Sequence, residues 1–133
     1  MATDLLFKEE CYTIIGLCMK IHTKLGRGFK EIVYKDALEV ELKKTSIVCE
    51  REKSFNIFYE GVLLPHKFNA DFYAFNAIIL EIKAVSQIHT DAFKQTINYL
   101  KASQIKLGIL ITLAPTNWSF RGLFALIKII SLY

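Results

Sequence analysis

Three charged residues lie in stretches of sequence that are otherwise apolar. Asp71 stands within Ala70-Asp71-Phe72-Tyr73, and ten residues after it Glu81 and Lys83 flank Ile82 in a second apolar stretch. Burying an unpaired charge is costly, so two carboxylates and an ammonium in a buried strand pair must neutralise one another or hold a metal ion. The pattern is typical of an active site.

The spacing of these residues favours a divalent cation. Side chains alternate along a strand, which places Glu81 and Lys83 on one face and Ile82 on the other, toward the core. Asp71 can reach the same face from a neighbouring strand, because the link at Phe75-Asn76 is short enough for a hairpin. Two carboxylates suit Mg²⁺, which prefers oxygen ligands at about 2.0–2.1 Å, and the backbone carbonyl of Ile82 can add another oxygen.

The ammonium of Lys83 has a separate part in this interpretation. Beside a bound cation it can position a water molecule and stabilise the charge that develops on a pentavalent phosphorus. The alternative is an ordinary ion pair on a solvated strand face, because an acidic residue two positions before a lysine occurs by chance at roughly one position in a hundred or two. The triplet alone does not decide between these two interpretations.

A third carboxylate lies on a predicted helix. Glu31, Tyr34, Leu38 and Leu42 fall on one helical stripe, so an acid shares a face with apolar and aromatic residues. Glu31 either stabilises the start of the helix or points into a site. The sequence leaves both interpretations open.

Two more polar residues lie on a later predicted helix. Gln95 and Tyr99 are four positions apart and therefore present an amide and a phenol together. Phe93, Ile97 and Leu100 form a separate packing stripe. An amide and a hydroxyl can bind a phosphate oxygen or orient a water molecule, or they can be interfacial polar residues without a special role.

The elements that position these residues follow from the periodicity of the sequence. Helical spacing runs over 4–25, with Asp4 as its cap, and again over about 29–44 after the break at Gly26-Arg27-Gly28. The later predicted elements are strands at 47–49, 55–59, 68–73 and 77–85, a helix at 90–103, a buried parallel strand at 106–113, and an edge strand or short helix within 120–133.

The composition fits a compact globular chain. With 133 residues and 53% hydrophobic content, one domain spanning 1–133 is expected. The net charge of +4 permits a polyanionic partner, although the basic residues are scattered. Three cysteines without a C-x-x-C pair fit reduced thiols, and neither a signal peptide nor a membrane span is recognisable, so a soluble cytoplasmic protein is expected.

The residues singled out above occur in a defined order along the chain. In that order they are Gly28-x-x-Glu31-x-x-Tyr34, Asp71, Glu81-Ile82-Lys83 and Gln95-x-x-x-Tyr99. Jointly they resemble the GxxExxY protein family of the PD-(D/E)xK nuclease-like superfamily, over about residues 22–113. The resemblance implies an α/β fold, a restriction-endonuclease-like core with a mixed central β-sheet flanked by α-helices.

The resemblance also implies roles for the site residues. Asp71 and Glu81 would bind Mg²⁺, with Mn²⁺ as the alternative cation, and Lys83 would assist the hydrolysis of phosphodiester bonds in DNA or another nucleic acid. Glu31 would contribute an acidic group from the first helical layer and serves a second metal ion in one version of the site. The supporting residues beside the site would be Gln95, Tyr99, Tyr34 and His22.

Three positions depart from the family pattern and motivate other hypotheses. The basic residue expected two positions before Asp71 is Asn69, the typical Asn-Phe-Gly is Thr112-Leu113-Ala114, and a basic pair is reduced to Arg121-Gly122. Because phosphate contacts dominate nucleic-acid affinity, the second hypothesis is a binding or repair accessory module with little hydrolysis. The third is a protein-interaction domain, with a homodimer formed through the apolar segment 123–133.

Overall fold

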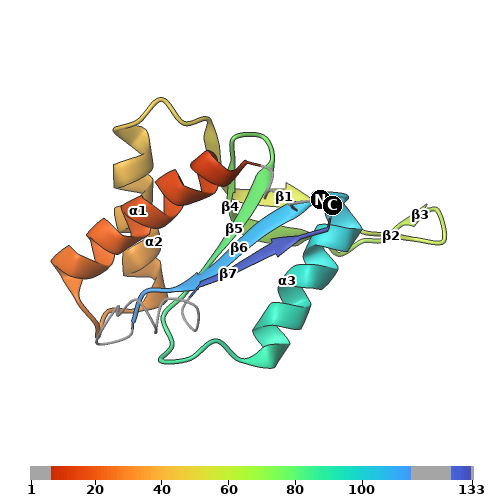
Figure 1. Ribbon diagram of the computed structural model, residues 1–133. Helices are drawn as coiled ribbons and strands as arrows, with labels where there is room; N and C mark the ends of the chain where they lie inside the picture. Colours follow the sequence, from red (N-terminus) through yellow and green to blue (C-terminus); the bar gives the residue numbers. More distant parts are fainter. Residues whose placement is uncertain (1–6, 115–126, 133) are drawn as a thin grey trace, which may run out of the picture.

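The fold is built on a mixed five-stranded β-sheet with α-helices on both faces (Figure 1). It is taken from a computed structural model of the chain, which describes residues 7–114 and 127–132. The predicted α/β architecture is therefore confirmed. The elements are α1 Lys8–Leu25, α2 Glu31–Lys43, β1 Cys49–Phe55, β2 Phe58–Tyr59, β3 Val62–Leu63, β4 Phe68–Ala74, β5 Ile78–Lys83, α3 Thr90–Ser103, β6 Leu107–Thr112 and β7 Ile127–Ser131.

The sheet has the strand order β1-β4-β5-β6-β7. Strands β5 and β6 are parallel and are joined through α3, whereas the other neighbouring pairs are antiparallel. Helices α1 and α2 pack on one face, and α3 packs on the other. The predicted parallel crossover is therefore confirmed.

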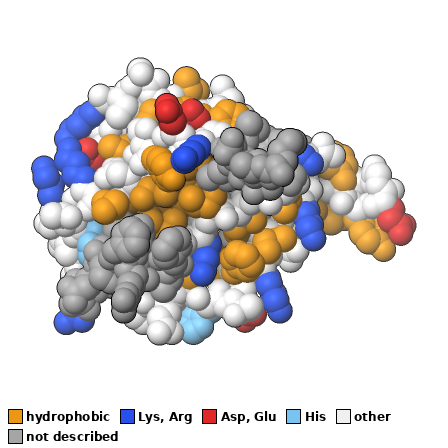
Figure 2. Space-filling view, viewed as in Figure 1, with side chains coloured by type: hydrophobic (Ala, Val, Ile, Leu, Met, Phe, Trp, Pro, Cys, Tyr) orange, Lys and Arg blue, Asp and Glu red, His pale blue; other side chains and the backbone are white. Residues whose placement is uncertain are grey.

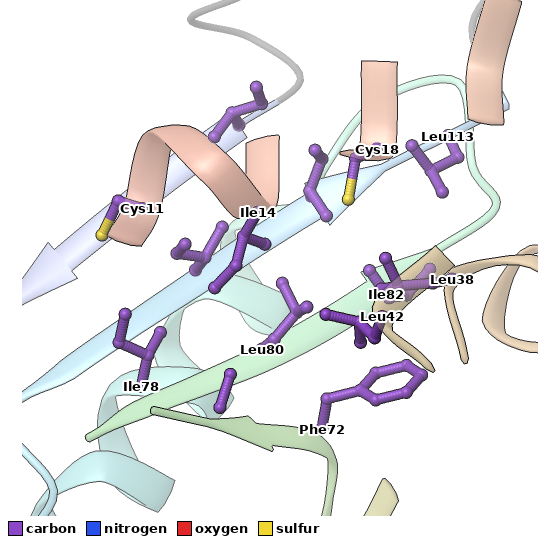
Figure 3. Packing of buried hydrophobic residues seen from close by; sticks show 14 of the residues in the cluster. Cys11, Ile14, Cys18, Leu38, Leu42, Phe72, Ile78, Leu80, Ile82 and Leu113 are labelled. Carbon is purple, nitrogen blue, oxygen red and sulfur yellow. The ribbon is translucent and has the colours of Figure 1, made fainter. Parts of the chain in front are cut away.

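The face under α1 and α2 is the main apolar core. Each of these two helices carries a buried stripe at helical spacing, as the sequence predicts. Figure 3 shows Ile14 and Cys18 from α1 over β6, and Leu38 and Leu42 from α2 over β5, in one apolar layer that also includes Cys11. Both cysteines of this stripe are free thiols in the core.

The first helix starts later than the sequence predicts. Helix α1 begins at Lys8 rather than at Asp4, which lies outside the described residues. Phe7 precedes it with a left-handed backbone at φ 60°, a conformation that interrupts a right-handed helix. The described helix therefore begins without a side-chain cap.

The prediction for the first strands was wrong in its bounds. Strands were expected at 47–49 and 55–59, whereas β1 runs from Cys49 to Phe55 across the gap between them, and only Phe58–Tyr59 of the second range forms the separate strand β2. Strand β1 is an edge strand in which half-buried and exposed residues alternate, and its positions 50–53 are Glu, Arg, Glu and Lys. Charged residues suit an edge that faces water, and here they hide the apolar signal on which strand prediction depends.

A separate two-stranded hairpin, β2–β3, projects from the body of the molecule (Figures 1 and 2). Phe58 pairs with Leu63 and Tyr59 pairs with Val62, and all four side chains are exposed. Because successive side chains on a strand point to opposite sides, the hairpin presents apolar groups on both of its faces. The aromatic run at 55–59 thus contributes to this projection rather than to the central sheet.

The turn between β4 and β5 lies where the sequence predicts it. Phe75 and Asn76 both have positive φ, 58° and 53°, and the amide of Ala77 donates to the carbonyl of Ala74. Two central residues with positive φ define a type I′ turn, whose twist suits an antiparallel pair. Tyr73 adds a hydrogen bond from its hydroxyl to the carbonyl of Asn76.

Strand β6 lies at the centre of the apolar core, and all of its residues are buried. On the α3 face, Gly108 comes so close to Leu100 that a Cβ at this position would lie 3.1 Å from a methyl carbon of the leucine. The absence of a side chain at Gly108 therefore allows α3 to pack closely on the sheet.

The last described strand, β7, pairs antiparallel with β6 at the edge of the sheet. Of the two predictions for 120–133, the edge strand is therefore correct for the part of that segment that the structure describes, and residues 120–126 and 133 lie outside it. Within residues 7–114 and 127–132, no helix is long and apolar enough to cross a membrane.

Candidate active site

The central sheet opens at Asp71. The β4–β5 register ends at the pair Phe72 and Leu80, so Asp71 is not paired with β5. On its other side, the β1–β4 register pairs the neighbours of Glu52 and Asp71 but not these two residues, and Glu52 has a positive φ of 54°. Irregularities of this kind bend a strand and redirect its side chains, and they are common beside active sites.

The carboxylate of Asp71 is held in this opening by two partners. Its Oδ2 accepts a hydrogen bond from the backbone amide of Ile82 at 2.8 Å, and its Oδ1 lies 2.7 Å from Nζ of Lys35. Asp71 is buried, so both contacts are made in a site with little access to water. The side chain thus replaces a ladder hydrogen bond and fixes the spacing between β4 and β5 at this point.

Glu81 lies beside Asp71 and is electrostatically strained. The residue is 7% exposed, and among the described residues its Oε1 is buried without a hydrogen-bond partner. Burial, the negative charge of Asp71 and a hydrogen bond to that carboxylate together raise the pKa of Glu81 to about 8, and burial is the largest of these causes. Two carboxyl groups this close cannot both ionise at low cost unless a cation joins them.

Lys83 is half-buried on the same face of β5 as Glu81. Its positive charge partly opposes the rise in the pKa of Glu81. Its backbone carbonyl accepts a hydrogen bond from the amide of Leu113, which holds the end of β5 against the end of β6. The structure therefore brings Asp71, Glu81 and Lys83 together, as the hairpin and the strand alternation predict.

Asp71 and Glu81, with the acidic residues that contact Lys35, form what is called here the carboxylate cluster. Glu31 is connected to Asp71 through Lys35. It is the first residue of α2, and its Oε2 lies 3.3 Å from Nζ of Lys35, which in turn contacts Asp71. The side chain of Glu31 is 40% exposed. Glu31 thus lies at the rim of the site. The helix-start interpretation and the site interpretation both apply, because Glu31 begins α2 and also contacts Lys35 beside Asp71.

Lys35 and Glu52 are the residues that sequence reasoning missed. The Lys35 side chain is only 12% exposed, and its Nζ also lies 3.9 Å from Oε1 of Glu52. Burial alone would lower the pKa of Lys35, but the hydrogen bond to Asp71 and the charges of Asp71 and Glu31 raise it. The four-residue spacing from Glu31 was the available signal for Lys35, although most such pairs lie on helix surfaces.

Tyr99 approaches the site from α3, whereas Gln95 does not contact it. Burial, and then the charge of Glu81, raise the pKa of Tyr99, and its ring stacks on Phe68 with centroids 4.2 Å apart. Gln95 is exposed one turn earlier on α3, and the contacts of the described residues do not join it to Asp71 or Glu81. Only half of the predicted amide and phenol pair is therefore in place.

Tyr34 and His22 support the framework around the site. The buried Tyr34 donates its hydroxyl to the carbonyl of Gly26 at 2.7 Å, which closes the connection between α1 and α2. Nδ1 of the buried His22 lies 2.9 Å from the carbonyl of Leu113 at the end of β6. Both residues thus fix backbone near the site.

The donor set suits a hard divalent cation. Among the residues that the structure describes, no group of three or more His, Cys, Asp and Glu side chains is arranged to hold a metal ion. Mg²⁺, however, is commonly bound by one or two carboxylates with water completing its shell. The partnerless Oε1 of Glu81 and its neighbour Asp71 supply these two carboxylates, and a cation would relieve the strain between them.

Comparison with known families agrees with this geometry. The family model of the PD-(D/E)XK nuclease superfamily matches residues 8–119, a span that includes α1 to β6 and every residue of the carboxylate cluster. Neither the curated proteins nor the solved structures gave a match. Because the family model covers most of the sequence, the chain belongs to the PD-(D/E)XK nuclease superfamily.

Proposed function

We propose that this protein is a Mg²⁺-dependent nuclease that hydrolyses phosphodiester bonds of DNA or another nucleic acid. Nucleases of the superfamily generally depend on a divalent metal ion and act on nucleic acids. The observation that carries the proposal is the pair Asp71 and Glu81, buried side by side in the opening of the sheet with Oε1 of Glu81 unsatisfied. Mn²⁺ is the alternative cation.

Each residue of the cluster has a distinct part in this proposal. Asp71 and Glu81 hold the cation, and the backbone carbonyl of Ile82 adds an oxygen. When bound, the cation supplies Lewis acidity and lowers the pKa of water. Lys83, on the face of Glu81, orients a water molecule and stabilises negative charge on the phosphoryl group as it develops.

The residues around the cluster position the substrate and the framework. Tyr99, whose phenol lies near Glu81, donates a hydrogen bond to a phosphate oxygen or to a water molecule. Gln95 would join it only when a substrate extends along α3, because its side chain is exposed. The net charge of +4 supports the approach of a polyanion.

Three further expectations remain parts of the proposal. They are membership of the GxxExxY family, a single domain over 1–133, and a homodimer formed through 123–133.

The decisive experiment is a cleavage assay with matched variants. The purified chain is incubated with single- and double-stranded DNA and RNA, in Mg²⁺, in Mn²⁺ and in EDTA. The variants are Asp71→Asn and Lys83→Ala, and the control is Lys101→Ala, which removes an exposed lysine in the last turn of α3. Metal-dependent cleavage that both site variants lose and the control keeps is the expected result.

Two other results would redirect the proposal. Cleavage that survives in Asp71→Asn and Lys83→Ala comes from a contaminant or from another site, and it contradicts the assigned roles. No cleavage by a folded protein, together with binding that weakens as salt rises, favours the accessory module, for which the exposed Asn69 in place of a basic residue is the supporting observation.

A further inference from the structure

Lys35 places a positive charge inside the carboxylate cluster. Its Nζ lies 2.7 Å from Oδ1 of Asp71, 3.3 Å from Oε2 of Glu31 and 3.9 Å from Oε1 of Glu52. Three acidic residues from α2, β1 and β4 thus converge on one ammonium, whose side chain is 12% exposed. Asp71 owes its neutralisation to this lysine.

A divalent cation at Asp71 would meet this ammonium at close range. Oδ2 of Asp71 already accepts the amide of Ile82, and Oδ1 faces Lys35, so no oxygen of this carboxylate is without a partner. Two positive groups on one carboxylate in a buried site repel strongly, because charge interactions are weakly screened there. The cation and the ammonium therefore compete for Asp71.

The other two acids offer the lysine a second position. The side chains of Glu31 and Glu52 are 40% and 51% exposed, compared with 11% for Asp71, so they lie on the solvent side of Nζ. A lysine side chain is long and flexible, and a shift of its ammonium toward these two carboxylates keeps it paired. Glu31 would then act on Lys35 rather than on the metal.

We infer that Lys35 is a resident counter-ion of Asp71 that competes with the divalent cation, and that Glu31 and Glu52 receive its ammonium when the cation binds. This inference rests on the proposed metal site at Asp71 and Glu81. Lys35 is accordingly a residue that sets metal affinity and holds the cluster together without metal. It does not need to touch the substrate.

The first test measures Mn²⁺ binding to the full chain by calorimetry, without substrate. Lys35→Met removes the charge and keeps most of the length of the side chain, and it is expected to bind Mn²⁺ about tenfold more tightly or better. Its thermal midpoint without metal falls, and saturating Mn²⁺ restores more of it than in the wild type. The control is Lys20→Met on α1, which breaks an ion pair of 2.8 Å with Glu41 of α2 and leaves Mn²⁺ affinity unchanged.

The outcomes separate this inference from the proposed function. Equal or weaker Mn²⁺ binding by Lys35→Met, when the wild type binds and Asp71→Asn does not, overturns the inference and leaves the metal site standing. Mn²⁺ binding that Asp71→Asn retains, or its absence from the wild type and Lys35→Met alike, overturns the metal site and the inference together. A double-variant cycle adds detail, because Glu31→Gln should lose its effect on affinity once Lys35 is Met.

A second measurement uses the wild-type chain and avoids any folding defect of Lys35→Met. Side-chain NMR of the lysine CεH₂ groups is followed during a Mg²⁺ titration. The Lys35 signal is expected to move with the same midpoint as the amide of Ile82, which reports on Asp71, while the Lys20 signal stays in place. A Lys35 signal that does not move while the Ile82 amide saturates contradicts the displacement.

Discussion

The two sides of β5 differ in completeness. Toward β6, its register continues over all six residues, from Ile78 with Leu107 to Lys83 with Thr112. Toward β4, it holds for three pairs and stops at Leu80. Strand β5 is therefore paired along its whole length on the β6 side but only along half of it on the β4 side, which is called the open side here. The charged residues lie where the pairing with β4 ends.

This difference explains how charges exist in an apolar sheet. A complete ladder satisfies its own backbone groups and leaves no room for polar side chains between strands. Where the ladder stops, the amide of Ile82 needs a partner, and Asp71 provides it. The unpaired amide of Ile82 therefore requires an acceptor, which is Asp71. The negative charge of Asp71 adds to the cost of burying an ionised Glu81 when no cation is bound.

The first prediction concerns activity at the open side. Glu81→Gln keeps the size of the side chain and removes its charge, and it should lower metal-dependent cleavage by about 1,000-fold or more, since even residues that only orient metal ligands are worth about 10–100-fold. Rates measured at saturating Mg²⁺ check this expectation, and calorimetry should show the variant at least as stable as the wild type at pH 7.5. Near wild-type turnover would remove Glu81 from the site.

The second prediction concerns stability at Leu80, the residue before Glu81 on β5, which is paired with both neighbouring strands. Leu80→Ala empties part of the fully buried core and should cost about 2–5 kcal/mol of unfolding free energy. Urea titration measures this loss. Ile129→Ala on the edge strand β7 is the control and should change stability by about 0.5 kcal/mol or less, because Ile129 is 36% exposed. Equal effects of the two substitutions would contradict the difference in packing.

The third prediction is a pH dependence of the metal-free protein. The raised pKa of Glu81, about 8, means that the folded state prefers the protonated carboxyl. This contribution is fully present below the ordinary glutamate pKa of about 4.5 and is lost as the pH rises through about 8, which removes on the order of 5 kcal/mol of stability. Urea titrations in EDTA between pH 5 and 9 should show the loss, and Glu81→Gln should lack it.

The smallest expected effect belongs to the phenol of Tyr99. Tyr99→Phe keeps the ring stacked on Phe68 and should reduce cleavage by about tenfold at most, the equivalent of one hydrogen bond of about 0.5–1.5 kcal/mol. Tyr73→Phe is the matched control, because its hydroxyl bonds the turn carbonyl of Asn76. The control should lose stability and keep its activity. If Tyr99→Phe also loses stability and keeps its activity, Tyr99 contributes to packing alone.

The regular parts of the fold could be predicted from the sequence because they follow apolar patterns. The helix at 90–103 and the buried strand β6 each carry a continuous signal of the expected length. The edge strand β1 could not be found in this way, since its central positions are charged. Strand prediction fails here because an edge strand needs little burial.

The candidate site was predictable in part for a related reason. Asp71, Glu81 and Lys83 stand out because their charges interrupt apolar runs. Lys35 does not stand out, because a lysine four residues after a glutamate on a helix is ordinary, and only the packing of α2 beside β4 brings it to Asp71. Contacts between elements that are distant in sequence leave no local pattern to read.

Gly108 carries a consequence for the precision of the site. Helix α3 sits at its present height above the sheet because Leu100 packs where a side chain on Gly108 would be, and Tyr99 is the residue next to Leu100. A methyl group at position 108 would push α3 away from the sheet by a few tenths of an ångström or force the Leu100 side chain aside. The distance between the phenol of Tyr99 and Glu81 therefore depends on the absence of a side chain at Gly108.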